Sequence, residues 1–189
     1  MSDERLESLG KQVSDQVPGQ GSPRDLQQPP LHLWQPALSG DIDIVIHRDG
    51  SWSHEGDPIR RQALVRLFAS ILRREADGDY YLVTPVEKWR IRVEGLPLQI
   101  VDFDSVSDDQ GRPGIEVTTN TLRRYPVGRD YPLFFAEVAG EKVPAVGLDY
   151  GLAAQFTRAA WYRLADACEE REGVAGIPSG GLFFPLQAD

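Results

Sequence analysis

Apolar and polar residues alternate at both ends of one stretch of the chain, residues 41–93. Alternation with a period of two is typical of strands that bury one face, so each end predicts a strand of a sheet. The alternating apolar residues are Ile42, Ile44 and Ile46 at the first end and Trp89, Ile91 and Val93 at the other.

An Asp-Gly pair after the first strand predicts a hairpin, and the length of its loop decides where Trp52 lies. A two-residue loop would pair His47 with Trp52 and would put the indole on the face opposite the isoleucines. A three-residue loop over residues 48–50, with Gly50 in the left-handed region, pairs Ile46 with Trp52. We favour the three-residue loop because it places the largest apolar side chain on the apolar face.

Helical spacing between the two strands predicts one amphipathic helix ending near residue 74. Asp57 followed by Pro58 is typical of a helix cap with proline in the first turn. The opposite face is basic, with five arginines and no acid between Arg60 and Arg74. The apolar residues at positions i, i+3, i+4, i+7 and i+8 are Leu64, Leu67, Phe68, Ile71 and Leu72.

The order hairpin, helix, strand recurs in the second half of the chain, over residues 131–186, with a second helix predicted over residues 150–170. The sequence therefore predicts an α+β protein of two similar repeats, each an antiparallel hairpin or curved sheet packed on one main helix. The residues before the first repeat are rich in Gln, Ser, Gly and Pro, which favours disorder. The predicted parts are a flexible N-terminal tail over residues 1–29 and repeats over residues 30–97 and 98–189.

Composition places the protein among ordinary globular proteins. Its 189 residues are 41% hydrophobic and 26% charged. No apolar run approaches the roughly 20 residues that span a bilayer, and the charged N-terminus leads into no secretory signal. The single cysteine, Cys168, cannot form an internal disulfide. These features predict a cytoplasmic protein without a membrane segment.

Charge is unevenly distributed along the chain. The net charge is −9, yet residues 60–92 carry eight basic and four acidic side chains, a local charge of +4. The acidic total disfavours broad nucleic-acid binding, because neutralising phosphates dominates that affinity. The local excess allows an unknown small anionic ligand or an acidic protein segment as partner. The alternative is that these arginines pair with nearby carboxylates on a solvated face.

Several short motifs stand out in the first half of the chain. They are the Leu-Trp-Gln-Pro of residues 33–36, the Gly-Asp-Ile-Asp of 40–43, the Asp-Gly-Ser-Trp of 49–52, the Pro-Ile-Arg-Arg of 58–61, the Leu-Val-Arg-Leu-Phe of 64–68 and the Leu-Val-Thr-Pro-Val-Glu-Lys-Trp of 82–89. These motifs resemble the DUF1285 family of uncharacterised bacterial proteins. The similarity runs from about Pro30 to the end of the chain and is strongest before Pro97. It implies a fold of two similar α+β repeats and a role in signal transduction, and it carries no activity or catalytic residues.

Catalytic motifs are missing from the sequence. It has no HExxH, CxxC, nucleophile elbow, Walker loop or dinucleotide fingerprint, so it predicts no catalytic residue, no metal site and no cofactor. The prediction therefore leans towards a protein that is not an enzyme. An enzyme of unrecognised type remains an alternative, with His54, Glu55 and Asp57 as an acid-base corner.

A groove beside the last strand of the first repeat is the binding site that we predict for a non-enzymatic module with a regulatory or signal-transduction role. Two tryptophans would form its apolar walls, and basic side chains would contact an anion. A structural protein that forms homo-oligomers through exposed strand edges is a further alternative. The residues of the predicted groove are Trp52, His54, Arg60, Glu87, Lys88, Trp89 and Arg90.

Overall fold

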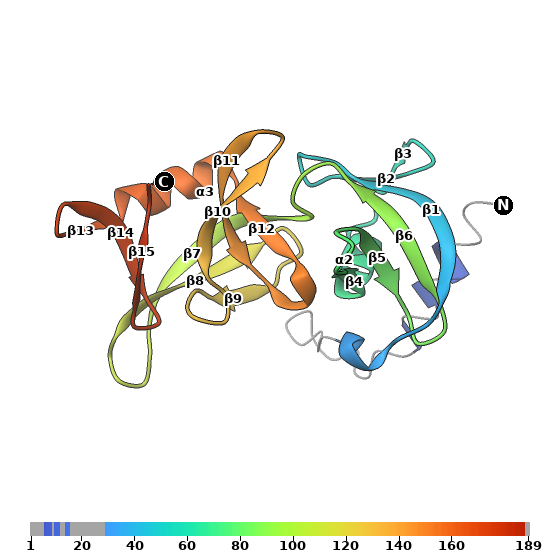
Figure 1. Ribbon diagram of the computed structural model, residues 1–189, viewed down its shortest axis with the longest axis horizontal. Helices are drawn as coiled ribbons and strands as arrows, with labels where there is room; N and C mark the ends of the chain where they lie inside the picture. The colour runs from blue at the N-terminus through green and yellow to red at the C-terminus, as the bar shows by residue number, and fades with distance from the viewer. Residues whose placement is uncertain (1–5, 9, 12–13, 16–28, 188–189) are drawn as a thin grey trace. The chain divides into compact units, whose positions relative to one another are not determined.

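The computed structural model describes residues 6–8, 10–11, 14–15 and 29–187 of the chain (Figure 1). The chain divides into two compact units, Met1–Glu94 and Gly95–Asp189. Both are mostly strand, with few helices.

The flexible tail predicted over residues 1–29 lies largely outside the described residues. The short pieces of it that the structure describes before residue 16 are helical, and Leu6 among them is buried. A Cβ atom built on Gly10 would lie 3.4 Å from a methyl group of Leu64, so this piece packs against the next helix of its unit.

The N-terminal unit is built on one six-stranded sheet with the order β3-β2-β1-β6-β5-β4. A short 3-10 helix precedes the sheet, and one α-helix interrupts its strands. These elements are η1 (Leu31–Leu33), β1 (Leu38–Ile46), β2 (Trp52–His54), β3 (Asp57–Pro58), α2 (Gln62–Ser70), β4 (Leu72–Arg74), β5 (Tyr80–Val83) and β6 (Lys88–Val93).

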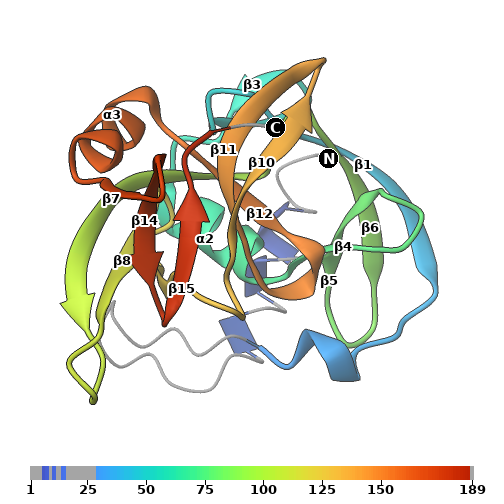
Figure 2. The same ribbon diagram turned by 60° about the vertical axis from the view of Figure 1, so that its left-hand side comes forward.

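The C-terminal unit contains a second six-stranded sheet, with the order β10-β11-β12-β7-β8-β9, and a small sheet with the order β13-β14-β15. Figure 2 brings this small sheet forward. The elements are β7 (Leu98–Ser107), β8 (Pro113–Thr119), β9 (Arg124–Pro126), β10 (Leu133–Val138), β11 (Glu141–Gly147), η2 (Asp149–Gly151), β12 (Ala153–Phe156), α3 (Arg158–Asp166), β13 (Glu169–Arg171), β14 (Val174–Ser179) and β15 (Leu182–Pro185).

The two large sheets share one connectivity. In each, three antiparallel strands run from the centre to one edge, and three more return from the other edge. The first and last strands then meet in parallel at the centre, as β1 with β6 and β7 with β12. The similarity of the two repeats is confirmed, but the predicted match of residues 41–93 with 131–186 is wrong. The strands that correspond are β1 to β6 and β7 to β12.

The helices are shorter than predicted, and they enter the two units at different points. In the N-terminal unit α2 joins β3 to β4, whereas in the C-terminal unit α3 follows β12. Asp57 and Pro58 do not cap α2 but pair with β2. In the second unit the apolar run that becomes β12 is predicted as helix, but α3 starts only at Arg158. Its N-cap is Thr157, whose hydroxyl accepts a hydrogen bond from the Ala160 amide. Short apolar runs fit either state, which explains both errors.

The predicted register of the first hairpin is confirmed. Ile46 pairs with Trp52 across a loop closed by Gly50, whose φ is 82°. The Trp52 side chain is 2% exposed and stacks on Phe68 of α2, with ring centroids 6.4 Å apart. The hairpin therefore delivers its largest side chain to the core beneath α2. A one-residue change of register would turn that side chain to solvent.

No α-helix in the described part of the chain is long and apolar enough to cross a membrane.

In the C-terminal unit, a buried serine fastens the β14–β15 hairpin to the large sheet. Ser179 is 1% exposed. Its hydroxyl donates a hydrogen bond to the Val127 carbonyl oxygen at 2.6 Å and accepts one from the Ile115 amide at 3.0 Å. Both backbone groups would lose their partner if this hydroxyl were removed.

We expect Ser179→Ala to lower the free energy of unfolding by about 1–3 kcal/mol, because it leaves a buried carbonyl and a buried amide unsatisfied. Urea unfolding followed by circular dichroism measures this change. Ser105→Ala, at an exposed position of β7, is the matched control and should change stability by less than about 0.5 kcal/mol. Equal effects of the two substitutions would show that the clamp does not contribute to stability.

Candidate functional site

The two faces of the N-terminal sheet differ sharply in polarity. The inward-facing side chains of β6 include Trp89 and Ile91, which pair across strands with Leu82 and Tyr80. The outward-facing side chains of β6 are all basic. The strand alternation read from the sequence is thus confirmed, and the candidate site lies on the outward face.

Arg90 is the centre of the ion pairs on this face. Its Nε donates to Asp41 Oδ1 at 2.7 Å, and its Nη1 donates to Asp79 Oδ2 at 3.2 Å. The neighbouring Arg92 pairs with Asp43 at 3.0 Å. The hydrogen bonds that Arg90 donates to Asp41 and then to Asp79 raise the pKa of Arg90, and the same bond to Asp41 lowers the pKa of Asp41. Opposite charges on neighbouring strands stabilise a sheet in this way.

A second group of charges is more deeply buried, at the β4 end of the face. Arg73, 8% exposed, donates to the carbonyl oxygens of Leu31 and Trp34 at 3.1 and 3.0 Å and to the Glu75 carboxylate. Lys88 Nζ donates to both oxygens of the same carboxylate, at 3.2 and 3.0 Å. Glu75 therefore holds two cations together, and Arg73 ties η1 to the sheet.

Two hydrogen-bonded groups on this face have shifted pKa values. Burial raises the pKa of Glu75, but the hydrogen bonds from Lys88 and Arg73 outweigh burial, so the pKa lies below its usual value. The Tyr81 hydroxyl donates to Asp77 at 2.7 Å, and this bond, followed by burial, raises the pKa of Tyr81 to about 12. Glu75 is thus held ionised and Tyr81 neutral near pH 7.

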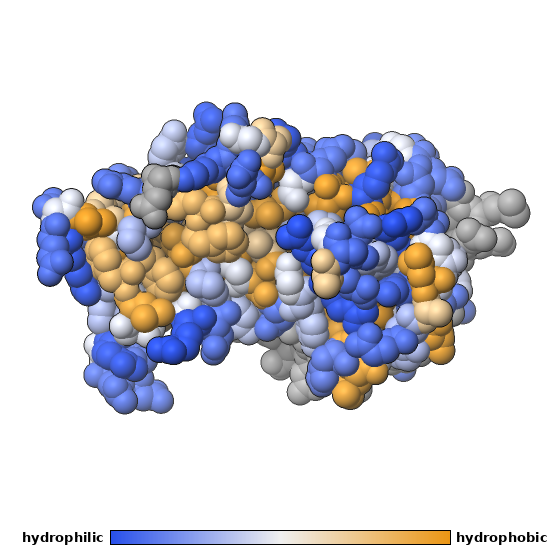
Figure 3. Space-filling model, viewed as in Figure 1, coloured by the Kyte–Doolittle hydropathy of each residue, from blue (hydrophilic) through white to orange (hydrophobic). Residues whose placement is uncertain are grey.

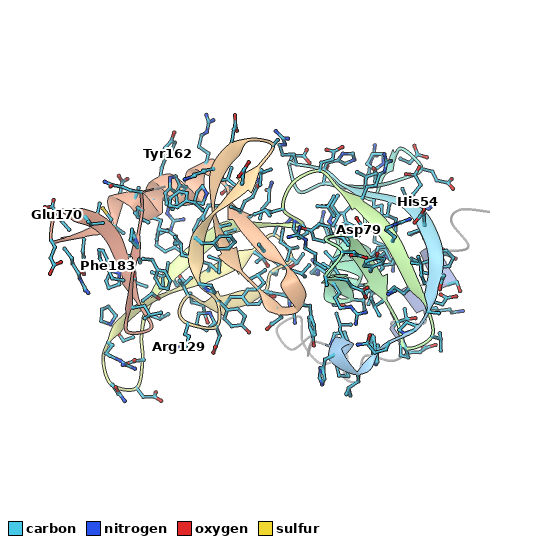
Figure 4. All side chains as sticks on the ribbon, viewed as in Figure 1. His54, Asp79, Arg129, Tyr162, Glu170 and Phe183 are labelled. Carbon is cyan, nitrogen blue, oxygen red and sulfur yellow. The ribbon has the colours of Figure 1, made fainter. Side chains whose placement is uncertain are left out.

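An open hollow of about 800 Å³ lies over β1, β5 and β6 on the same face. Its charged lining has four carboxylates and two guanidinium groups, so the hollow carries two excess negative charges at neutral pH. Asp79, one of these carboxylates, is labelled in Figure 4. The residues that matter for its chemistry are Asp41, Asp43, Val45, Asp79, Arg90, Arg92 and Glu94.

A serine, a histidine and a carboxylate line up beside the hollow, an arrangement that sequence reasoning missed. His47 Nε2 lies 2.8 Å from Ser53 Oγ, and His47 Nδ1 lies 3.3 Å from Glu94 Oε2. This order of contacts is that of a serine hydrolase triad. Ser53, however, is 6% exposed, in the middle of a sheet. A nucleophile needs an open side for the substrate carbonyl, and Ser53 has little such surface.

The predicted groove residues do not form one site. Trp52 is buried in the core and cannot form a groove wall, which corrects that part of the prediction. His54 is also buried, on the inward face beside Trp52. Arg60 is exposed just before α2, away from the sheet face that holds Lys88 and Arg90. Only these last two reach the outward face together.

Glu87 and Trp89 are joined to each other at the start of β6. The Trp89 Nε1 donates to Glu87 at 3.3 Å. A Cβ atom on Gly40 would lie 3.5 Å from the Trp89 ring, so the indole packs closely on the backbone of β1. This pair locks the start of β6 against β1, which is a structural role.

The acid-base corner predicted at His54, Glu55 and Asp57 is a tight turn. Glu55 and Gly56 have φ of 50° and 86°, and both carboxylates are exposed, whereas the His54 ring is buried. Among the described residues, His54 and Asp57 pair through their backbones, and no side-chain hydrogen bond joins them. The described residues also contain no group of three or more potential metal ligands from His, Cys, Asp and Glu.

The carboxylates of β1 are the candidate-site residues that the sequence could not assign. Asp41 and Asp43 alternate with the isoleucines and so face solvent, which the sequence pattern does indicate. Their partners Arg90 and Arg92 lie 49 residues later in the chain. No local signal predicts the parallel pairing of β1 with β6, and that pairing alone brings them together.

Family models match nearly all of the chain. The model described as "Domain of unknown function (DUF1285), N-terminal domain" covers residues 29–96. The model described as "Protein of unknown function (DUF1285), C-terminal domain" covers residues 97–186. No curated protein matches the chain.

Two solved structures resemble the chain. The crystal structure of a DUF1285 family protein from Silicibacter pomeroyi DSS-3 has 38% identity and a TM-score of 0.80, and the match covers 96% of this chain and 93% of that one. The DUF1285 family protein from Shewanella baltica OS155 has 28% identity and a TM-score of 0.52, and the match covers 65% of this chain and 90% of that one. Neither description states an activity.

We expect Glu75→Gln to destabilise the protein at neutral pH, because it leaves Arg73 and Lys88 without their shared anion. The loss should lie between the ~1 kcal/mol of a surface ion pair and the ~3–5 kcal/mol of a buried pair broken on one side. The pKa of Glu75 is lower in the folded state, so its stabilisation is present above the unfolded value of about 4.3 and is lost as pH falls through the folded pKa.

Denaturant unfolding at pH 7 and near pH 3 measures the free energy of unfolding of wild type and of Glu75→Gln. The difference between the two should be smaller near pH 3 than at pH 7. The control is Glu170→Gln, at an exposed position of β13 that Figure 4 labels. A gap that stays constant with pH, or one matched by Glu170→Gln, would contradict the role of Glu75.

Proposed function

Because the chain belongs to the DUF1285 family, whose domains are described only as being of unknown function, we propose a function from the site itself. The protein is a non-enzymatic binding module that recognises a basic segment of a partner protein. The hollow on the outward face of the N-terminal sheet carries this proposal, since its lining has two excess negative charges.

The ion pairs support a cationic rather than an anionic partner. Arg90 and Arg92 are the basic side chains of the hollow, and each already pairs with an aspartate. An anion would have to displace these carboxylates, whereas a lysine or arginine side chain can join them. The proposed partner is therefore positively charged, whereas the local charge of residues 60–92 alone predicts a negatively charged one. An acidic segment is the competing partner that the experiment below also measures.

Apolar surface among the charges supports a peptide rather than a simple ion. Val45 takes part in the lining, and Ile42 of β1 and Tyr80 of β5 border it. A basic segment with alternating lysine and apolar residues would contact both kinds of surface, because long cationic side chains lay their methylenes on apolar groups. The strands hold all these side chains in fixed positions, so little entropy is lost when the partner binds.

Binding without chemistry suits the regulatory or signal-transduction role that the family resemblance implies. The single cysteine supports the reducing cytoplasm as the compartment in which the module works. The net charge of −9 argues against nucleic acid as partner and favours attraction of a basic protein segment at a distance.

Fluorescence anisotropy with a labelled oligolysine peptide tests the proposal. We expect Asp43→Asn combined with Glu94→Gln to raise the Kd at least about tenfold, since each lost charge contact contributes about 1 kcal/mol in water. The binding should weaken as salt is added. The charge-matched control combines Asp109→Asn with Glu170→Gln on exposed positions of the other unit, and it should bind almost as well as wild type.

Two outcomes would overturn this proposal. Tighter binding of an oligoglutamate peptide of the same length would restore the anionic partner. Equal loss of oligolysine binding in both double variants would mean that the peptide responds only to net charge and not to the hollow.

The alternative that the protein is an enzyme has one specific observation in its favour, the alignment of Ser53, His47 and Glu94. Labelling with a fluorophosphonate, followed by intact mass spectrometry, tests it. We expect no adduct, because Ser53 is almost fully buried. An adduct on Ser53 that disappears in His47→Ala would identify a hydrolase-type nucleophile and would count against the non-enzymatic proposal.

A further inference from the structure

The strand edges of this protein differ in how they are protected. An exposed edge offers unpaired backbone groups to other chains, and proteins block such edges with short strands, prolines or charges. Five of the six described sheet edges are blocked in these ways. They are β3 (Asp-Pro), β4 (Leu-Arg-Arg), β9 (Arg-Tyr-Pro), β13 (Glu-Glu-Arg) and β15 (Leu-Phe-Phe-Pro).

The sixth edge, β10, has only one of these features, the charge of Glu137. It is six residues long, Leu-Phe-Phe-Ala-Glu-Val, with no proline and no basic residue. Its pairing with β11 runs without a register shift from Leu133 to Val138. Within the described residues no strand pairs with its other side. The β10 edge is therefore free of bulges, six residues long and unpaired on its outer side within the described residues.

The turn of the β10–β11 hairpin fixes which backbone groups of β10 point outward. The two turn residues, Ala139 and Gly140, have φ of 52° and 82°, as a type I′ turn requires. In such a hairpin the flanking pair, Val138 with Glu141, exchanges backbone hydrogen bonds, and every second pair does likewise. The residues whose N–H and C=O point away from β11 are therefore Leu133, Phe135 and Glu137.

A proline in the partner strand agrees with this assignment. Pro144 of β11 lies opposite Phe135. Because proline has no N–H, it can occupy a ladder only where that group would point away from the partner. The outward backbone groups of β10 follow from two independent features of the same hairpin.

Apolar side chains flank the open edge. Phe134 is 39% exposed, and Phe135 is held on the other face by an edge-on contact with Trp161 of α3, at 5.8 Å between ring centroids. Figure 3 shows apolar surface gathered on the C-terminal unit around β10 and the β14–β15 hairpin. A strand added to β10 would cover part of this surface.

We propose that β10 pairs antiparallel with β10 of a second copy of this chain. The twofold axis passes by Phe135, which lies opposite Phe135 of the second copy, and Leu133 lies opposite Glu137. In this register every outward N–H and C=O of the three residues gains a partner. The two large sheets then join across the dimer axis.

Charge favours a second copy as the occupant. Glu137 is the single charged residue of β10. In the proposed register the two Glu137 side chains stand four residues apart along the strands, about 13 Å at ~3.3 Å per residue, which exceeds the Debye length of about 8 Å at physiological salt. Apolar residues otherwise meet apolar residues. One strand pair makes a small interface, so the dimer is expected to be weak, with a Kd of about 10 μM or more.

Sedimentation equilibrium of the full chain over a wide concentration range tests the proposal. Wild type should shift with concentration from 21.1 kDa towards twice that mass. Glu137→Pro removes an outward N–H of β10 without touching the β10–β11 ladder, and it should stay monomeric. Lys142→Pro is the matched control, because Lys142 lies opposite Glu137 in β11 and its N–H points away from β10. This control should dimerise like wild type.

A second variant and a second measurement guard against simple misfolding. Phe134→Lys keeps the backbone intact, puts a charge beside the edge and should weaken dimerisation at least tenfold. Amide exchange at Leu133, Phe135 and Glu137 should slow as protein concentration rises. A chain that remains monomeric throughout would overturn the proposal and leave the edge to a strand from another protein. A dimer that survives in Glu137→Pro and Phe134→Lys would place the interface elsewhere and overturn it too.

Discussion

The parallel pairing of the first and last strands of each large sheet is the constraint on which the rest of the structure depends. Each large sheet consists of two antiparallel meanders, and a meander of three short strands has little stability of its own. The pairs β1 with β6 and β7 with β12 join the meanders into one sheet. Because a long connection separates the two strands of each parallel pair, this central ladder is a non-local contact, and contacts of this kind make folding slow.

The same ladder assembles the candidate site. Asp41 and Arg90 are 49 residues apart, and they meet because their strands are neighbours at the centre of the sheet. The local charge of +4 over residues 60–92 does not predict the ion pair between Arg90 and Asp41, because a charge count over one segment includes only residues close in sequence. The sequence predicts a basic face, but in the structure aspartates pair with the arginines of this face, and the hollow on it carries a net negative charge.

Local patterns predicted the features of this protein that local physics determines. The hairpin register was predicted because only that register places Trp52 on the apolar face of the strand. The two faces of β6 were predicted from the alternation of apolar and basic residues. The family resemblance rested on the same local motifs. Helix ends could not be predicted, because Leu72 fits an extended helical face as well as it fits strand β4, and only its pairing with Leu82 decides between them. Ser53, His47 and Glu94 could not be grouped without the sheet.

The two large sheets share one connectivity, but the α-helix stands at a different point of the chain in each unit. The exposed strand edges of the two units therefore differ. In the N-terminal unit α2 bridges the two outer strands of the sheet, β3 and β4, and both of these edges are short. In the C-terminal unit only residues 127–132 link the equivalent strands, β9 and β10, because the helix has moved to follow β12. Removing the helix from that connection frees the β10 hairpin to extend. Among the described sheet edges β10 alone lacks both proline and basic residues, and it is therefore the edge at which we propose that a second copy pairs.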